Sequence, residues 1–303
     1  MPPSLVTRFA PSPTGLLHLG HAYSALLNHD LAQAHGGDFR LRIEDIDQTR
    51  CQPGFEAAIR EDLLWLGMEG VGPVFRQSER LGVYQDAIDK LAARGLVYRC
   101  FKTRSELQEA MRAPHGGTVS QSALHSATAP LPTDEEDMMM AEGRPFAWRL
   151  NARRALETIG PKPLTWREFN GAGADHQHPI DPSSLGDEVL ARKDVPTSYH
   201  LASVIDDAAQ DVSLVWRGED LRSAIPIHRV LQELLGLPQP LYRHHALVTD
   251  EQGRRLAKRD KAETLRALRE SGATPQDIRQ RLGLPPADER AESAGSAQSP
   301  KGV

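Results

Sequence analysis

The sequence contains little cysteine and no long apolar run. Only two of its 303 residues are cysteine, Cys51 and Cys100, and they lie far apart along the chain. A disulfide framework is therefore not expected, and the reducing cytoplasm is the expected compartment. No apolar run approaches the ~20 residues that span a bilayer, and the N-terminus lacks a signal-peptide pattern, so we expect no membrane association.

Basic residues are not in excess either. The formal net charge is −5 at pH 7, which argues against a protein that coats nucleic acid nonspecifically. A local basic face is still enough to contact phosphate groups, so a nucleic-acid partner is not excluded. The length allows two modest domains, or one domain that carries a large insertion.

Strands and helices alternate in the first third of the chain. The predicted elements are a strand at 6–9, a turn at 11–15, a helix at 20–34, a strand at 39–43, and helices at 54–66 and 80–94. A strand, a helix and a second strand at this spacing predict a parallel α/β sheet.

The pattern changes between about residues 100 and 190 and then returns. A loop rich in small residues is predicted at 113–132, and the strands of a smaller unit are predicted at 146–150, 164–169 and 188–191. The α/β pattern resumes at 199–205, 212–216 and a helix at 225–235, followed by two short helices within 262–282. Thr274-Pro275 opens the second of these, and the polar segment 291–303 is predicted to be a disordered tail.

These changes predict an inserted domain within a nucleotide-binding sheet. We expect a catalytic domain formed by residues 1–100 and 192–245, an inserted domain of 101–191, a short helical region of 246–285, and a tail of 286–303.

Two histidines stand where the first predicted strand passes into the first predicted helix. His18 and His21 are three residues apart, so both fall on one helical face and can reach one phosphate group. A helix N-terminus presents unpaired N–H groups and a positive dipole end to phosphate. Gly20, which lacks a side chain, lets an adenine ring lie against the backbone. The alternative is a pair of capping or core histidines.

Three carboxylates follow the second predicted strand. The carboxyl end of a parallel strand is the functional edge of the sheet, and Glu44 is the first carboxylate beyond it. We expect Glu44 to bind a substrate ammonium or a metal. For Asp45 and Asp47 we favour structural roles, namely helix capping and ion pairs with Arg50.

A basic run, Arg254 to Asp260, follows a predicted turn. A loop with several cations can close over a triphosphate and offset the charge that develops in phosphoryl or adenylyl transfer. The alternative is a solvated surface segment.

Taken together, these motifs resemble the signatures of glutamyl-tRNA synthetases. The matching segments are collinear and cover most of residues 5–260: Arg8–Gly15, His18–His21, Leu41–Asp47, Val195–Ala202, Ile205–Asp207, Trp216–Leu221 and Arg255–Arg259. The resemblance implies the Rossmann-type parallel sheet of class I aminoacyl-tRNA synthetases, with an inserted smaller α+β domain and a short helical C-terminal part.

The resemblance also implies roles for individual residues. Those expected to bind glutamate are Arg8, Ala10, Ser12, Glu44, Tyr199 and Arg217. Those expected to bind ATP are His18, Gly20, His21 and Lys258, and all of these except Gly20 are also expected to act in catalysis. A dicarboxylic amino acid needs cations for its carboxylates, and an arginine can bind one bidentately. The implied products are glutamyl-adenylate and pyrophosphate, with Mg²⁺ bound to the ATP.

Only about forty residues follow Lys258. Within the family, this length resembles the glutamyl-Q tRNA(Asp) synthetases, a shortened branch that attaches glutamate to the queuosine base at the wobble position of tRNA(Asp). We therefore expect a monomer whose macromolecular partner is the tRNA(Asp) anticodon stem-loop. The alternatives are a shortened synthetase that charges a tRNA 3′ end and a catalytically inactive tRNA-binding homologue.

Zinc is not expected. Relatives often open a zinc site with a Cys-x-Cys-Thr-Arg pattern, but this sequence reads Cys100-Phe-Lys102-Thr-Arg104 and has no downstream Cys-x-Cys partner. Tetrahedral zinc needs four closely arranged nitrogen or sulfur ligands. Four histidines lie within the predicted insertion, His115, His125, His176 and His178. The first two could in principle assist Cys100, but all four are interpreted as exposed side chains.

Overall fold

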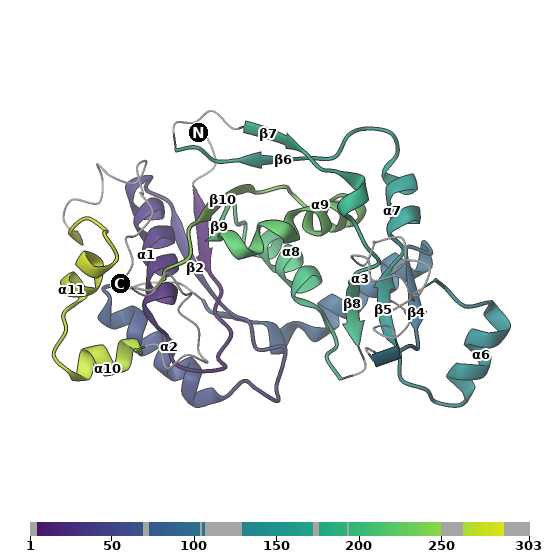
Figure 1. Ribbon diagram of the computed structural model, residues 1–303, viewed down its shortest axis with the longest axis horizontal. Helices are drawn as coiled ribbons and strands as arrows, with labels where there is room; N and C mark the ends of the chain where they lie inside the picture. Colours follow the sequence, from purple (N-terminus) through teal and green to yellow (C-terminus); the bar gives the residue numbers. More distant parts are fainter. Residues whose placement is uncertain are drawn as a thin grey trace, which may run out of the picture.

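The computed structural model describes most of the chain, and Figure 1 shows how its elements are arranged. The described residues are 5–68, 73–103, 105–106, 129–171, 176–192, 194–249 and 263–287. The predicted basic run, the predicted tail at 291–303 and most of the predicted loop at 113–132 lie outside them. Among the described residues, no helix is long and apolar enough to cross a membrane.

The N-terminal part forms a parallel sheet of three strands. β1 (Val6–Phe9), β2 (Asp38–Ile43) and β3 (Phe75–Arg76) lie side by side in this order. Helix α1 (Leu19–Ala34) connects β1 to β2, helix α2 (Pro53–Trp65) connects β2 to β3, and both add apolar side chains to the core around the sheet. The predicted strands and helices of this part are confirmed to within about one residue at each end.

A second sheet adjoins the first. Its strands are β7 (His176–Pro179), β6 (Thr165–Glu168), β10 (Leu241–His245) and β9 (Leu214–Gly218), in that order. β9, β10 and β6 are parallel to one another. Ser213 N–H donates to Val6 O at 3.0 Å, and Val6 N–H donates to Ser213 Oγ at 2.8 Å. These bonds hold the start of β1 beside the start of β9.

One predicted strand lies in a different sheet from the one expected. The sequence assigned residues 164–169 to the smaller inserted unit, whereas β6 pairs in parallel with β10, with Glu168 opposite Tyr242. The reason is apolar packing. The Trp166 ring meets Tyr242 edge to face, with 6.1 Å between ring centroids, and both belong to a core cluster that includes Val215 and Ile225.

A third, antiparallel sheet lies farther from β1. It has the order β4 (Val97–Cys100), β5 (Ala147–Leu150) and β8 (Val189–Arg192), which confirms the strands predicted at 146–150 and 188–191. Its apolar side chains form one cluster with four helices, α3 (Leu81–Ala93), α7 (Ala152–Ile159), α8 (Tyr199–Ala209) and α9 (Ile225–Leu235). The 3-10 helices are η1 (Gln77–Arg80), η2 (Pro182–Ser184) and η3 (Glu219–Ala224).

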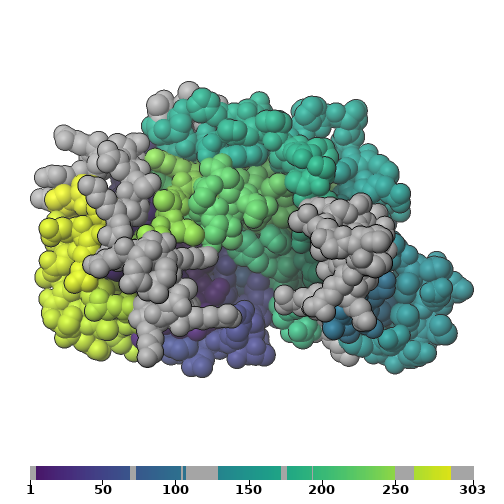
Figure 2. Space-filling view, viewed as in Figure 1, coloured from purple at the N-terminus to yellow at the C-terminus, as the bar shows by residue number. Residues whose placement is uncertain are grey.

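The two predicted C-terminal helices are present as α10 (Leu265–Glu270) and α11 (Pro275–Arg281). Thr274 caps α11 in a capping box with Asp277, as the Thr-Pro start predicted. The Leu265 N–H donates to Leu17 O at 2.8 Å, so α10 begins beside the loop that precedes α1. In Figure 2 these helices, coloured yellow, lie at one end of the molecule, and α6 (Thr133–Ala141) lies at the other.

Candidate active site

His18 and His21 form the N-terminal cap of helix α1. Gly20 N–H donates to Nδ1 of His18 at 3.1 Å, and His18 N–H donates to Nδ1 of His21 at 3.2 Å. In each ring Nδ1 is thus an acceptor, so a neutral ring carries its proton on Nε2. The two predicted roles, capping and phosphate binding, are compatible, because capping uses Nδ1 and phosphate binding would use Nε2–H.

Gly20 has a packing role that the sequence did not reveal. A Cβ at this position would lie 3.1 Å from Cε1 and 3.2 Å from Nδ1 of the His18 ring. Any side chain would therefore press on the ring that caps the helix. The glycine keeps the His18 ring and the first turn of α1 in close contact.

Arg8 and Arg42 share one buried carboxylate. Asp207, on α8, accepts from Arg42 Nη1 at 2.6 Å and from Arg8 Nε at 3.2 Å, and all three side chains are buried. Burial acts to raise the pKa of Asp207, but the guanidiniums of Arg42 and Arg8 hold this pKa below its ordinary value. Asp207 is therefore ionised at neutral pH, and it fixes Arg8 at the carboxyl end of β1.

Glu44 lies just beyond β2, next to this pair. Its Oε1 accepts from Arg42 Nη2 at 3.3 Å, and its N–H donates to Pro11 O at 3.0 Å. Burial raises the pKa of Glu44, while Arg42 and Arg8 act in the opposite direction. A substrate ammonium beside Glu44 would favour its charged form, as expected for a site that binds an amino group.

The predicted ion pair between Asp47 and Arg50 is present, but neither Asp45 nor Asp47 caps the helix that follows, because the N-cap of α2 is Gln52. Asp45 accepts from Ser78 N–H at 2.9 Å and from Ser78 Oγ–H at 2.6 Å. Asp47 accepts from Thr49 N–H at 3.2 Å and pairs with Arg50 Nε at 2.6 Å. Both carboxylates therefore bind groups of the chain around the segment that follows β2.

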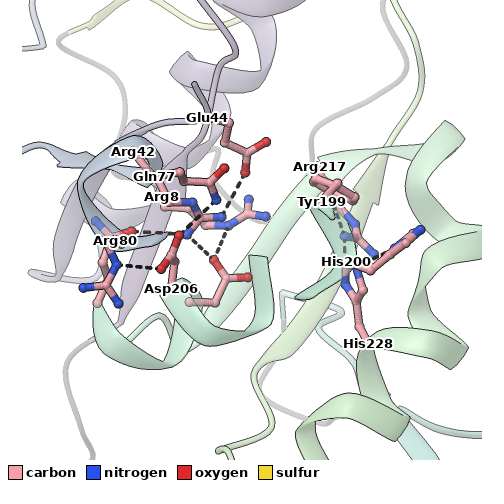
Figure 3. Close-up of polar contacts among 12 residues, drawn as sticks. Arg8, Arg42, Glu44, Gln77, Arg80, Tyr199, His200, Asp206, Arg217 and His228 are labelled. Carbon is pink, nitrogen blue, oxygen red and sulfur yellow. Dashed lines mark hydrogen bonds and ion pairs between the residues drawn. The ribbon is translucent and has the colours of Figure 1, made fainter. Parts of the chain in front are cut away.

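Arg217, on β9, faces the same region from the second sheet. It is 4% exposed, and its Nη1 donates to Tyr199 Oη at 3.1 Å and to His228 Nδ1 at 3.3 Å. Its Nε and Nη2 are buried and have no hydrogen-bond partner among the described residues. Two buried N–H donors left unpaired at a cavity wall are suited to a carboxylate, which arginine binds bidentately. Figure 3 shows Arg8, Arg42 and Glu44 on one side and Arg217, Tyr199, His200 and His228 on the other.

A single cavity of about 540 Å³ joins these groups. All of the site residues predicted within the described part of the chain line it, namely Arg8, Ala10, Ser12, His18, Gly20, His21, Glu44, Tyr199 and Arg217. Lys258, the remaining predicted residue, lies outside the described residues. Sequence reasoning missed Asp220, His245 and Leu247, which also line the cavity. Asp220 lies in the matching segment Trp216–Leu221 but was assigned no role, and His245 carries no local signal beyond its position at the end of β10.

A second cavity, of about 430 Å³, adjoins the first. The two cavities share Ser12, Glu44 and Tyr199 as lining residues. The second also has apolar walls from Ile46 and Val189. A group bound in the second cavity can therefore meet a group bound beside Glu44.

The sequence matches the family described as tRNA synthetases class I (E and Q), catalytic domain, over residues 4–292. The chain belongs to this family. Members of the family use ATP as a substrate, which agrees with the histidine pair at the start of α1. The match also agrees with the fold, because the sheets and helices are those of a class I synthetase.

Relatives with names and solved structures give a finer comparison. The chain is 47% identical over 289 residues to a Rhodobacter capsulatus protein named glutamyl-Q tRNA(Asp) synthetase, covering 92% of this chain and 100% of that one. It is 40% identical to a protein of the same name from Nocardia farcinica, covering 92% and 85%. A crystal structure of glutamate-tRNA synthetase from Elizabethkingia anophelis superposes with a TM-score of 0.76 at 28% identity, and this chain covers 66% of it.

Cys100, the first cysteine of the pattern with which relatives open a zinc site, is buried at the end of β4. The described residues hold no group of three or more histidine, cysteine or acidic side chains placed to bind a metal. His115 and His125 lie outside the described residues. The expected absence of zinc stays a prediction.

Proposed function

We propose that the protein activates L-glutamate with ATP and transfers the glutamyl group to the queuosine base of tRNA(Asp). The observation that carries this proposal is the single cavity that holds the histidine pair of α1 at one end and Arg8, Glu44 and Arg217 at the other. The names of the Rhodobacter and Nocardia relatives support the choice of acceptor.

Glutamate fits the charged end of the cavity. Its two carboxylates bind to Arg8 and to the unpaired Nε and Nη2 of Arg217, while its ammonium binds to Glu44. Tyr199 supports Arg217, and Ser12 lies between the two cavities. The arrangement selects a dicarboxylic amino acid, because an apolar side chain would leave a buried guanidinium without a counter-charge.

Activation needs positioning more than acid–base catalysis. An oxygen of the glutamate α-carboxylate attacks the α-phosphorus of ATP, the bond to pyrophosphate breaks, and glutamyl-adenylate forms. His18 and His21 donate their Nε2–H groups to the phosphates, and Lys258 neutralises part of the charge that develops. Mg²⁺ bound to the ATP would supply further positive charge. The carboxylate is already ionised, so the step uses no general base.

The second cavity is the proposed site of the acceptor. A hydroxyl of the queuosine cyclopentene ring attacks the carbonyl carbon of the adenylate, the bond to AMP breaks, and an ester forms. The hydroxyl proton passes to the departing AMP phosphate. Because the cavities meet at Ser12, Glu44 and Tyr199, a base that enters the second cavity reaches the activated carboxyl group. Unstacked loop bases of RNA are typically held in such pockets by stacking and by hydrogen bonds to their edges.

We also propose the division of labour along the chain. Residues 1–100 and 192–245 form the catalytic unit of a monomeric enzyme, 246–285 contribute the ATP-binding loop, and 101–191 form the inserted unit. Strands β6 and β7 lie within 101–191 in the sequence, but they belong to the same sheet as β9 and β10 of the catalytic unit. The part of 101–191 that is separate from the catalytic unit is therefore smaller than these bounds.

The test is an acceptor assay with labelled glutamate. Labelling is expected with tRNA(Asp) that carries queuosine, with an isolated queuosine anticodon stem-loop, and with tRNA(Asp) trimmed of its 3′-terminal adenosine. No labelling is expected when guanosine replaces queuosine. Labelling that needs the 3′ adenosine but not queuosine would identify a 3′-end synthetase instead, and the absence of glutamate-dependent ATP–pyrophosphate exchange with and without tRNA would identify an inactive homologue.

A further inference from the structure

Two histidines outside the proposed catalytic set lie behind Arg217. His228, on α9, is 2% exposed, and its Nδ1 lies 3.3 Å from Arg217 Nη1. Its Nε2 lies 3.2 Å from Nδ1 of His200, on α8. His200 in turn lines the second cavity. Figure 3 shows the contacts among the three side chains. They form a chain from Arg217, which lines the first cavity, to His200, which lines the second.

The direction of each hydrogen bond follows from the chemistry of the groups. A guanidinium has only donors, so His228 Nδ1 must accept from Arg217. A neutral His228 then carries its proton on Nε2 and donates to His200 Nδ1. A neutral His200 accordingly carries its own proton on Nε2. One arrangement of protons satisfies both contacts, and it requires both rings to be neutral.

We infer that His228 and His200 are positioning residues that hold Arg217 with its Nε and Nη2 directed into the cavity. The inference rests on the proposed assignment of Arg217 to a glutamate carboxylate. Tyr199 and His228 both bind Nη1, which leaves the other two nitrogens for the substrate. His200 acts one step farther back, because its Nδ1 fixes the tautomer in which His228 is an acceptor.

A proton added to either ring breaks this chain. A charged His200 would present N–H at Nδ1 to the N–H of His228, and a charged His228 would present N–H to the guanidinium. Burial, followed by Arg217, keeps the pKa of His200 below its ordinary value and that of His228 well below it. The pair is thus neutral at physiological pH and becomes sensitive only under acid conditions.

The charged groups around the pair come from several elements. Those that act on His228, besides His200, are Arg217 on β9, Arg8 on β1 and Arg42 on β2. Tyr199, on α8, contacts both rings, with 5.5 and 5.6 Å between centroids. The second cavity, which His200 lines, adds Glu44, Asp47, Arg50 and Arg192. The cations nearest to His228 oppose its protonation, so His200 is the ring expected to titrate first.

The experiment measures glutamate binding by calorimetry with the full-length protein and its variants at pH 8. His228→Leu and His200→Leu remove the contacts, and each is expected to weaken glutamate binding, His228→Leu by about 10- to 100-fold. His200→Asn places an amide oxygen near the position of Nδ1, so it is expected to weaken binding much less than His200→Leu. His29→Gln is the control, because His29 is also a buried helical histidine and contacts Phe39 rather than the cavity.

The pH dependence separates positioning from simple packing. As pH falls from 8 to the lowest value at which both proteins stay folded, wild-type affinity is expected to fall more steeply than that of His200→Asn, which lacks the titrating ring. Titration of glutamate and of Glu44 is common to both proteins, so the ratio of their affinities isolates His200. Parallel pH profiles for the two proteins would overturn the inference.

Two further results keep this inference distinct from the proposed function. If Arg217→Gln abolishes glutamate binding while His228→Leu and His200→Leu bind as His29→Gln does, the positioning role is wrong and the assignment of Arg217 stands. If Arg217→Gln binds glutamate like the wild type, the proposed glutamate site itself is wrong. Should the leucine variants fail to fold, nitrogen NMR of labelled wild-type histidines decides: both rings must be neutral with the proton on Nε2, and any other tautomer contradicts the inference.

Discussion

The two ends of the cavity are built in different ways. The nucleotide end is formed by residues close together in the sequence. His18, Gly20 and His21 lie in one helical turn, and the hydrogen bonds that fix them join residues only two or three positions apart. The amino-acid end is assembled from distant segments, since Asp207 lies 165 residues from Arg42 and 199 residues from Arg8. The first end depends on the start of one helix. The second depends on the docking of α8 and β9 against β1 and β2.

The largest effect is expected where the distant segments meet. Asp207→Asn removes the carboxylate that neutralises Arg42 and Arg8, both of which are buried. Breaking one partner of such a network typically costs about 3–5 kcal/mol of unfolding free energy. Because the pKa of Asp207 is lowered in the folded protein, this stability is present above the unfolded pKa and is lost as pH falls through the folded pKa. Urea unfolding at pH 7.5 measures the loss.

The control is an exposed ion pair in the same sheet. Asp38 and Arg40 on β2 form a pair at 3.1 Å in which the two side chains are 54% and 31% exposed. Asp38→Asn is expected to cost less than about 1 kcal/mol, as exposed pairs usually do. Equal losses of unfolding free energy in Asp207→Asn and Asp38→Asn would show that the buried network stabilises the fold no more than an exposed ion pair does.

The contrast also explains how much of the site the sequence predicted. The histidine pair and Glu44 follow from the spacing of residues and from their position at the end of a strand, which are local properties. His200 and His228 could not be predicted, because nothing in either helix sequence shows that the two rings meet behind Arg217. Their partnership is created by the packing of α8 against α9.

The fold shows the same limit. Elements predicted from apolar patterns, such as α1 and β2, lie where the sequence placed them. The strand at 164–169 was predicted as a strand but assigned to the wrong sheet. A short apolar pattern predicts that a segment is a strand, but it does not predict which strand lies beside it. Here the contact between Trp166 and Tyr242 places β6 beside β10.

The next largest effect is expected at the nucleotide end. Lys258→Ala should reduce glutamate-dependent ATP–pyrophosphate exchange by roughly 10²–10³, as the loss of one preorganised charge does at such sites. The unfolding free energy should stay unchanged, which separates this variant from Asp207→Asn. Lys90→Ala is the control, because Lys90 is exposed in the last turn of α3. Exchange by Lys258→Ala at the level of Lys90→Ala would show that the basic run was misassigned.

The third largest effect is expected at a buried carboxylate whose ion pair among the described residues is long. Asp62, on α2, lies 3.6 Å from Arg269 of α10, and neither of its carboxylate oxygens has a hydrogen-bond partner among the described residues. Burial raises the pKa of Asp62 from 3.8 to about 6, against the opposing charge of Arg269. The pKa of Asp207 is shifted in the opposite direction, because Arg42 and Arg8 keep its carboxylate ionised.

The sign of the pH effect follows from that shift. Between pH 3.8 and about 6 the folded state binds more protons at Asp62 than the unfolded state, so stability falls as pH rises through this window. Asp62→Asn removes this titrating group. As pH rises from 4 to 8, the unfolding free energy of Asp62→Asn should increase by roughly 2–3 kcal/mol relative to that of the wild type. Unfolding measured across this range checks it, with Asp86→Asn on α3 as the exposed control. A constant difference between Asp62→Asn and wild type at all pH values would contradict the assignment.

The smallest expected effect tests the close packing at the start of α1. Gly20→Ala places a methyl group 3.1 Å from Cε1 of His18, so the ring must shift by a few tenths of an ångström. The KM for ATP in the exchange assay should rise about tenfold or less, which corresponds to the partial loss of one charge-assisted hydrogen bond. Stability should stay the same or increase slightly, because alanine is the better helix former. Gly82→Ala is a matched control, since Gly82 is also the second residue of its helix, α3, and a Cβ there would have no neighbour within 4 Å among the described residues. Similar KM values in the two variants would mean that the contact between Gly20 and His18 does not set the position of the ring, and the nucleotide end would then be less dependent on local geometry than its hydrogen bonds indicate.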